Sequence, residues 1–494
     1  MVGCGPGDPE LLTLKGLRLI QNADIIIYDR LINNRVLAFA QPNTELIDVG
    51  KNSKSTGSCQ DKINKLLIQK AKLGKKVIRL KGGDPFLFGR GGEEALFLKK
   101  EGVPFQIIPG VTSAIAAPAY AGIPVTHRNV SSSVTFVSGN EDPSKQRSAI
   151  NWSAISNTGG TVVVLMGRGK LQSISTELIN GGLKPTTPAA LIRWGSEPHQ
   201  KTITGNIQNI AEKADETSIT PPVVLVVGKV VNLREELNWF EQLPLFGKRI
   251  LVTRTRDQAS KLSALLAKEG AIPLELPSIA IKPINIKMLQ KQIKHVDKYS
   301  WIVFTSSNAV KVFFDTLYSL GLDSQHLNKS KFATIGPATT SSLNKHHILE
   351  TLKPTTFNTR ELGNLLVNEG MSNQTILLPR SESGHDEFVN RLRNSGGIVE
   401  DIKVYKTYIP ERSKKTASDI LKGGIDIATF TSSSTVYGLV SLLGGINELK
   451  NVTIACIGPV TEEAARQVGL KPDISVSEST VESMVKAVKE HFAR

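Results

Sequence analysis

The amino-acid sequence predicts an α/β protein with largely parallel sheets and at least two domains. Short apolar runs, which are typical of buried strands, alternate with segments whose hydrophobic residues recur at helical spacing. The clearest strand candidates are Ile25–Tyr28, Lys76–Leu80 and Thr161–Leu165, and helices are expected over residues 13–22 and 61–72. The chain has 494 residues, which is more than one hydrophobic core usually organises, so several domains are expected.

The alternation of strands and helices breaks near residues 238–247, an aromatic segment that contains a proline. A fresh strand is expected directly afterwards, at Arg249–Thr253. A domain boundary is therefore predicted in this segment. The expected domains are residues 1–243, with subdomains of about 1–125 and 126–243, and residues 247–494.

The second half contains an internal repeat. Phe304–Val310 recurs as Phe430–Val436, and Ile335–Thr339 recurs as Ile457–Thr461. The offset of roughly 120 residues is the size of one small α/β domain. The repeat predicts two similar lobes, with a ligand cleft at the carboxyl ends of their strands. A looser pair is Leu251–Arg254 with Leu377–Arg380, and the expected lobes are A, about 247–281 plus 410–494, and B, about 282–409.

The composition points to an anionic partner. The formal net charge is +15 and the pI is about 9.5, which suits nucleic acid, a membrane surface or an acidic small molecule. Aromatic residues make up only 5%, and no Lys/Arg cluster is interleaved with stacking residues, so nucleic acid is disfavoured. No apolar run of membrane-spanning length and no signal peptide are evident, so we expect a cytoplasmic protein that binds no membrane. The three cysteines, Cys4, Cys59 and Cys456, have neither metal-ligand spacing nor a disulfide framework.

Two glycine-rich turns carry the strongest local signal. Gly3-Cys4-Gly5-Pro6-Gly7-Asp8-Pro9 opens the chain, and Gly82-Gly83-Asp84-Pro85 follows a predicted strand. Such turns let backbone approach a small molecule closely. A dinucleotide site is one alternative, with Asp29 as the ribose acid. Pro6 argues against it, because proline lacks an N–H where that fold needs amides around a pyrophosphate.

Residues 1 to about 243 resemble uroporphyrinogen-III C-methyltransferases in an ordered series of motifs. These motifs are Val2–Gly16, Tyr28–Leu31, Val49–Lys51, Arg79–Glu94, Pro109–Ser113, Gly122–Arg128 and Val227–Val231. Residues from about 247 to the end are similar to uroporphyrinogen-III synthases, through the two-lobe repeat and Val404–Thr407. The resemblance implies a two-subdomain tetrapyrrole methylase fold followed by a two-lobed synthase of two similar parallel-sheet α/β domains.

The same resemblance implies consecutive reactions of tetrapyrrole biosynthesis. Hydroxymethylbilane would be cyclised to uroporphyrinogen III with inversion of the last ring, without cofactor or metal. Two methyl groups from S-adenosylmethionine would then give precorrin-2, on a branch to sirohaem or cobalamin. Homodimerisation through the methyltransferase half is also expected. One alternative keeps the methyltransferase and makes the second half a noncatalytic tetrapyrrole-binding module.

Site residues in the first half follow from the family motifs. Asp29 and Lys51 correspond to the positions assigned as proton acceptor and proton donor. Alternatively, Asp29 caps a strand end or pairs with Arg30, and Lys51 is a solvated cation. Arg30, His127 and Arg128 are candidates for the acceptor's carboxylates, although His127 alone is more often structural. The expected donor site comprises Pro6, Gly82, Gly83, Asp84, Leu87, Thr112, Ser113, Met166 and Gly195.

Two members of that donor set have alternative interpretations. The Asp84 carboxylate is expected to hold a polar part of the donor, but an isolated Gly-Gly-Asp-Pro is usually a tight surface turn. Met166 could equally fill the core.

In the second half, Tyr405 corresponds to the family tyrosine proposed to assist departure of the hydroxyl. A tyrosine at a strand end is also commonly a packing residue. Hydroxyls near the strand ends are expected to bind the substrate's acetate and propionate groups, although Ser and Thr fill turns everywhere. These hydroxyl residues are Thr305, Ser306, Thr339, Ser432 and Thr461.

Overall fold

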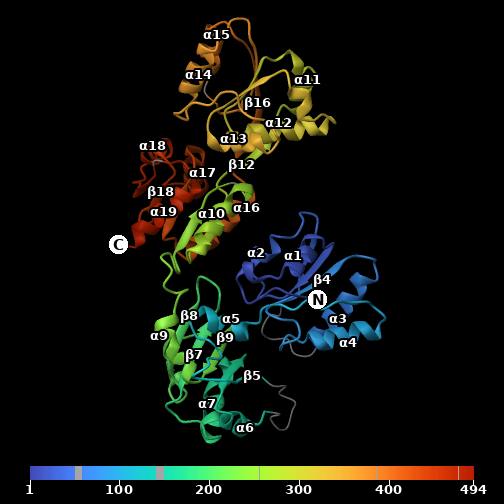
Figure 1. Ribbon diagram of the computed structural model, residues 1–494, viewed down its shortest axis with the longest axis vertical. Coiled ribbons are helices and arrows are strands. Elements are labelled where there is room, and N and C mark those ends of the chain that lie inside the picture. Colours follow the sequence, from blue (N-terminus) through green and yellow to red (C-terminus); the bar gives the residue numbers. More distant parts are fainter. Residues whose placement is uncertain (51–57, 141–149, 255, 385, 477, 494) are drawn as a thin grey trace. The chain divides into compact units, whose positions relative to one another are not determined.

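The computed structural model describes residues 1–494 except 51–57, 141–149, 255, 385, 477 and 494 (Figure 1). The described chain divides into two compact units. The first comprises Met1–Lys248 with Ala267–Ile272, and the second Arg249–Leu266 with Pro273–Arg494. Among the described residues, no helix combines the length and the apolar character needed to cross a bilayer.

The first unit begins with a parallel sheet of strand order β1-β4-β2-β3. Both faces of this sheet are covered, because Ile26 and Leu80 pack in one apolar cluster and Ile25 and Ile27 in another. Continuous apolar strands are typical of such doubly covered parallel sheets. The elements are β1 (Val2–Gly3), α1 (Leu14–Gln21), β2 (Ile25–Tyr28), α2 (Asn34–Leu37), β3 (Glu45–Asp48), α3 (Ser58–Ala71), β4 (Val77–Lys81) and α4 (Gly91–Lys100).

The second sheet of this unit has the order β5-β6-β9-β7-β8 and departs from the expectation of largely parallel sheets. Only β5 and β6 pair in parallel; the other pairings are antiparallel. The reason is the short loop between β7 and β8, since a parallel pair needs a long crossover. The elements are α5 (Ser113–Tyr120), β5 (Val134–Ser138), α6 (Trp152–Asn157), β6 (Thr161–Leu165), α7 (Leu171–Asn180), β7 (Pro188–Arg193), β8 (Lys201–Asn206), α8 (Ile210–Glu216), β9 (Val223–Val227) and α9 (Arg234–Leu237).

The second unit contains two five-stranded sheets, with strand orders β11-β10-β17-β18-β19 and β12-β16-β15-β13-β14. The elements of lobe A are β10 (Arg249–Val252), α10 (Arg256–Lys268), β11 (Ile272–Glu275), α16 (Glu411–Lys422), β17 (Ile427–Phe430), α17 (Ser433–Leu443), β18 (Thr453–Cys456), α18 (Pro459–Gln467), β19 (Ile474–Ser475) and α19 (Val481–Phe492). Those of lobe B are β12 (Ala280–Pro283), α11 (Ile286–Ile293), β13 (Trp301–Phe304), α12 (Ser307–Ser319), β14 (Lys331–Thr334), α13 (Pro337–Asn344), α14 (Thr359–Asn368), β15 (Thr375–Ser381), α15 (Glu387–Asn394) and β16 (Ile398–Tyr408).

The repeat in the sequence corresponds to a repeat in the sheets. Strands β10, β17 and β18 lie side by side in lobe A, as their counterparts β15, β13 and β14 do in lobe B. The pairings of β17 with β10 and β18, and those of β13 with β15 and β14, are all parallel. Lobe B adds β12, which is antiparallel to β16, so its sheet is mixed at one edge. The matching order places the motifs after β13, β14, β17 and β18 at carboxyl ends of adjacent parallel strands.

Candidate functional site

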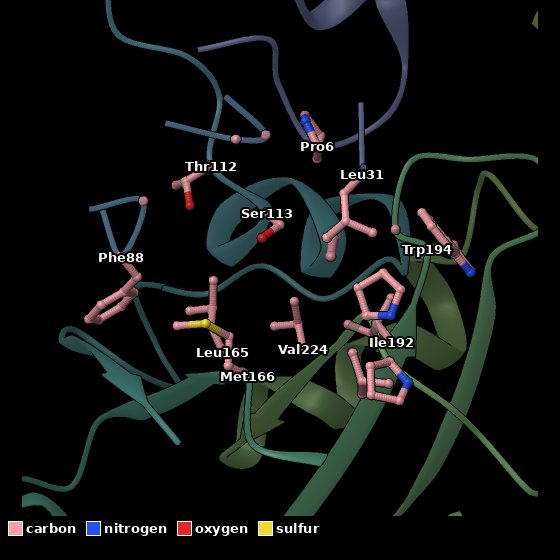
Figure 2. Close-up of a pocket in the computed structure, with 18 of the residues that line it drawn as sticks. Pro6, Leu31, Phe88, Thr112, Ser113, Leu165, Met166, Ile192, Trp194 and Val224 are labelled. Atoms are coloured by element: carbon pink, nitrogen blue, oxygen red, sulfur yellow. The ribbon is translucent and has the colours of Figure 1, made fainter. Parts of the chain in front are cut away.

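A cavity of about 430 Å³ lies in the first unit, where turns of the first sheet face the second sheet. Figure 2 shows Pro6, Thr112 and Ser113 on one side of it and Leu165, Met166 and Val224 on the other. Ile192 and Trp194, at the end of β7, form a further wall. The lining includes all of the residues expected for the donor site, namely Pro6, Gly82, Gly83, Asp84, Leu87, Thr112, Ser113, Met166 and Gly195.

The two glycine-rich turns are joined backbone to backbone. The Gly83 N–H donates to the Gly5 carbonyl at 2.7 Å, and the Gly5 N–H donates to the Gly83 carbonyl at 3.3 Å. A Cβ at Gly110 would lie 2.3 Å from the Gly83 oxygen, so this crossing admits no side chain. Gly82 differs, because a Cβ there would meet no atom within 4 Å. Gly82 thus presents bare backbone to open space beside the cavity.

The Asp84 carboxylate organises the loop between β4 and α4. Its Oδ1 accepts the N–H groups of Phe86 at 2.8 Å and Leu87 at 3.1 Å. Its Oδ2 accepts the Gly110 N–H at 3.0 Å. These three bonds support the turn interpretation of Gly-Gly-Asp-Pro and tie the loop to the segment that precedes α5. That Asp84 also holds a polar part of the donor stays a prediction.

The opposite side of the cavity is set by α5 and by the loops that follow β6 and β7. Thr112 caps α5, since its hydroxyl accepts the Ala114 N–H at 3.2 Å. A Cβ at Gly195 would lie 2.3 Å from the Ala117 Cβ, so glycine is what lets this loop pack on α5. Met166 has a left-handed φ of 57° and is 50% exposed, which excludes the core-filling interpretation.

A network of buried charges lies behind Asp29 at the end of β2. Arg79 Nη2 is 2.6 Å from Asp29 Oδ1, and Lys81 Nζ is 4.0 Å from Asp29 Oδ2. Asp29 therefore pairs with Arg79 and Lys81 on β4, where the sequence suggested Arg30 or a strand-end cap. Its side chain is 35% exposed, whereas those of Arg79 and Lys81 are almost fully buried.

Glu94 of α4 completes this network. Its Oε1 lies 3.3 Å from Arg79 Nε and 3.0 Å from Lys81 Nζ, and it accepts Gln60 Nε2 at 3.1 Å. Its Oε2 is buried without a hydrogen-bond partner in the described part of the chain. Burial, and then the neighbouring Arg79 charge, lower the pKa of Lys81.

Sequence reasoning missed Arg79, Lys81 and Glu94 as members of the charge network behind Asp29. The available signal was the pair of cations inside β4, because charged side chains in a buried strand require partners. Trp194 and Phe88, which also line the cavity, were missed as well. Nothing in their local sequence distinguishes them from ordinary apolar residues.

The candidates for substrate contact in the first half, together with the candidate proton donor Lys51, separate into three groups. Arg30 lines the cavity next to Leu31. His127 and Arg128 lie exposed in the turn after α5, where the His127 N–H donates to the Ser131 carbonyl at 2.9 Å, and neither lines the cavity. Lys51 lies outside the described residues.

In lobe B, Tyr405 and Ser306 are in direct contact. The Tyr405 hydroxyl lies 3.0 Å from Ser306 Oγ, and the tyrosine is 6% exposed. The register of β15 against β16 shifts between the pairs Arg380–Lys403 and Ser381–Tyr405, so the strand bulges just before the tyrosine. A bulge re-aims the side chain beside it. Tyr405 therefore combines the packing role that sequence allowed with a polar contact at the strand end.

The remaining hydroxyl candidates sit at the beginnings of helices that follow parallel strands. Ser306 caps α12 by accepting the Ala309 N–H at 3.1 Å, and Ser432 occupies the same position before α17. Thr305 directly precedes Ser306, at the end of β13. Thr339 and Thr461 lie in the first turns of α13 and α18 and are buried. Helix amino termini carry unpaired N–H groups that suit anions.

Comparison with known proteins matches each half of the chain to a protein family. The family model of tetrapyrrole (corrin/porphyrin) methylases matches residues 1–211, and that of uroporphyrinogen-III synthase HemD matches residues 260–486. The chain is 38% identical to the porphyrin biosynthesis protein HemD of Ruminiclostridium josui, over 99% of this chain and 97% of that protein. It is 50% identical to the S-adenosyl-L-methionine-dependent uroporphyrinogen III methyltransferase of Methanosarcina barkeri, over 48% of this chain and 93% of that protein.

Among solved structures, the uroporphyrin-III C-methyltransferase of Thermus thermophilus with S-adenosylhomocysteine aligns over 47% of this chain and 97% of that chain. The identity is 39% and the TM-score is 0.41. The full-length match to the Ruminiclostridium josui protein, together with the two family models, accounts for both sequence halves. The chain belongs to the family of porphyrin biosynthesis proteins in which a uroporphyrinogen-III C-methyltransferase domain is fused to a uroporphyrinogen-III synthase domain.

Proposed function

We propose that the protein catalyses two consecutive steps of tetrapyrrole biosynthesis. The second half cyclises hydroxymethylbilane to uroporphyrinogen III, and the first half transfers two methyl groups from S-adenosylmethionine to that product, giving precorrin-2. The observation that carries this proposal is that every residue expected for the donor site lines one and the same cavity. The net charge of +15 suits anionic tetrapyrrole substrates, which it attracts over long range.

The lining of the cavity supports S-adenosylmethionine as its ligand. Its walls are mostly apolar side chains with a few polar backbone and hydroxyl groups, which is usual for small-molecule sites. Gly82 leaves room for close backbone contact with the donor, and the Thr112 and Ser113 end of α5 offers N–H groups. When bound, the donor supplies an electrophilic methyl group.

The chain's own residues then have to orient the acceptor and remove a proton from the methylated carbon. Asp29 is the proton acceptor in this proposal, because its carboxylate is partly exposed at a strand end next to Arg30 of the cavity wall. Arg79 and Lys81 fix the position of that carboxylate from behind, and Glu94 fixes them in turn. Lys51 serves as the proton donor, and Arg30, His127 and Arg128 contact the acceptor's carboxylates.

In the synthase half, Tyr405 assists departure of the hydroxyl from hydroxymethylbilane. The Ser306 hydroxyl at 3.0 Å orients the phenol, and its own cap bond to Ala309 orients the serine. The helix amino termini after β13, β14, β17 and β18 bind the substrate's carboxylates, with Thr305, Thr339, Ser432 and Thr461 adding hydroxyls. No cofactor enters this step, and the intact enzyme forms homodimers through its methyltransferase half.

The decisive experiment supplies the intact protein with hydroxymethylbilane and S-adenosylmethionine and identifies the tetrapyrrole by mass spectrometry and isomer analysis. Precorrin-2 is expected. If the product without methyl donor is only the nonenzymatic type I isomer, the second half is a binding module instead. If uroporphyrinogen III accumulates unmethylated, the proposal for the first half is wrong.

A Tyr405→Phe variant tests the role of the phenol. The ring stays in the core, so the unfolding temperature should change little, whereas the cyclisation kcat should fall by at least tenfold. Ser306→Ala should lower kcat less, because it removes only the group that orients the phenol. Wild-type kcat in Tyr405→Phe would contradict the assignment.

A further inference from the structure

The two lobes place an arginine at equivalent positions, at the carboxyl ends of the equivalent strands β10 and β15. The Ile272 N–H donates to the Lys248 carbonyl at 2.8 Å in lobe A, and the Ile398 N–H donates to the Gln374 carbonyl at 2.8 Å in lobe B. Ile272 and Ile398 are separated by the same number of residues as Arg254 and Arg380, so the two arginines occupy equivalent positions. The lobes can therefore be compared residue by residue around these arginines.

Arg380 of lobe B is neutralised within the protein. Its Nε and Nη2 bind the two oxygens of Asp401 at 2.6 and 2.7 Å, and Nη2 also reaches Asp386 Oδ1 at 2.6 Å. The side chain is 3% exposed. Bidentate pairing of this kind is the strongest arrangement available to a guanidinium.

Arg254 of lobe A lacks both partners. The position equivalent to Asp386 is Ser260, which carries no charge, and the position equivalent to Asp401 is Glu275, which is exposed. The Arg254 Nε is buried without a hydrogen-bond partner in the described part of the chain, and burial lowers the pKa of the guanidinium. A buried donor without a partner destabilises the fold, so the unpaired Nε indicates a hydrogen-bond acceptor on a bound ligand.

The position of Arg254 indicates what that partner is. Arg254 follows β10, which lies next to β17, and the β17 end carries Ser432. The strand end is rigid, because Thr253 Oγ1 donates to the Thr429 carbonyl at 2.8 Å and Ser278 Oγ donates to the Thr253 carbonyl at 3.2 Å. The arginine is thus held at the same sheet edge as the hydroxyl and amide groups proposed for substrate carboxylates.

We propose that Arg254 binds a carboxylate side chain of the tetrapyrrole substrate and is the charged anchor that lobe A contributes to the synthase site. The proposal rests on the proposed synthase function. Lobe B offers no equivalent cation, since Arg380 is already paired with two carboxylates. The substrate's acetate and propionate groups supply the bidentate acceptor that a guanidinium fits.

Arg254→Gln and Arg254→Lys variants of the intact protein test this proposal by steady-state kinetics with hydroxymethylbilane. We expect Arg254→Gln to raise KM at least tenfold with kcat within threefold of wild type, and Arg254→Lys to fall between them. The unfolding temperature should be unchanged or higher, because the buried Nε makes no hydrogen bond in the described part of the chain that the substitution could remove. Arg466→Gln is the control: Arg466 is 54% exposed in a surface pair with Glu462, and KM should not change.

A second readout measures binding directly. Uroporphyrin III carries the same carboxylates, and its affinity for wild type and Arg254→Gln can be measured by fluorescence titration. Binding at least tenfold weaker supports the anchor, and equal binding with an unchanged KM overturns it. A lower unfolding temperature with unchanged binding also overturns it, because the role is then structural. If wild type forms only the type I isomer, the synthase function fails, and the titration still decides the role of Arg254.

Discussion

Replacing Gly82 with alanine separates the contribution of bare backbone at the donor cavity from its contribution to folding. A Cβ at Gly82 would meet no atom within 4 Å, and Gly82 is not among the glycines with a left-handed φ. The folded backbone therefore accepts alanine without strain. Alanine also restricts the unfolded chain, so the free energy of unfolding should rise by about 0.4–1 kcal/mol.

The effect on ligand binding should have the opposite sign. Gly82 lines the cavity of about 430 Å³, and the added methyl group enters space that the donor occupies in the proposed function. Overfilling a packed site costs about 1–3 kcal/mol, which corresponds to roughly 5- to 150-fold weaker binding. Isothermal calorimetry with S-adenosylhomocysteine measures the affinity, and urea denaturation measures the stability.

Gly92→Ala is the matched control. Gly92 lies in α4, its added Cβ would also meet nothing within 4 Å, and it does not line the cavity. It should show the gain in stability with unchanged affinity. Gly110→Ala should instead destabilise the fold, because its Cβ would lie 2.3 Å from the Gly83 oxygen. Wild-type affinity in Gly82→Ala would refute the inference that the donor contacts this backbone.

Three further predictions concern buried titratable groups. Burial raises the pKa of the Glu197 carboxyl, so this group stabilises the fold below its pKa in the unfolded chain, and that stabilisation is lost as pH rises through its pKa in the folded protein. Glu197→Gln should therefore be more stable than wild type at pH 8 but not at pH 4. A stability difference in urea denaturation that does not depend on pH would contradict this. Glu94→Gln leaves Arg79 and Lys81 without their buried counter-charge and should lower the free energy of unfolding by about 3–5 kcal/mol. A loss below about 1 kcal/mol would show that the buried ion pairs of Glu94 contribute little to stability. Burial raises the thiol pKa of Cys4 and Cys456 to about 12 each, so both thiols should react slowly in the folded protein. At pH 8, iodoacetamide should modify both cysteines in urea and neither in the folded protein, as measured by peptide mass spectrometry. Rapid labelling of the folded protein would contradict their burial.

Local sequence was sufficient to identify the strands that carry the proposed donor site. The apolar runs at Ile25–Tyr28 and Thr161–Leu165 form β2 and β6 with those bounds, and Lys76–Leu80 is shifted by one residue in β4. Helix 13–22 is α1 with its capping residues, since the Thr13 hydroxyl accepts the Gly16 N–H at 3.1 Å. These elements are predictable because hydrophobic periodicity and capping act within one turn or strand.

Pairing over long distances was not predictable in the same way. Glu94 reads as one of two acids in the first turn of a helix, and only the packing of α3 and α4 on the sheet buries it against Arg79 and Lys81. The antiparallel pairings of the second sheet likewise depend on the short return from β7 to β8, which apolar strand patterns alone do not reveal.

The internal repeat shows how a duplicated fold separates structural from functional residues. Positions that must pack are retained in both lobes: β10 with β17 and β15 with β13 form the same parallel pairs. The arginines at the carboxyl ends of β10 and β15 are retained as well, but among the described residues only Arg380 has carboxylate partners. If both arginines served only the fold, loss of those partners would leave the buried Arg254 Nε without a hydrogen bond in the described part of the chain, at a cost in stability. The features that the two lobes share, such as the parallel strand pairs, therefore reflect the fold. The position where their charges differ, around Arg254, is where a substrate contact is expected.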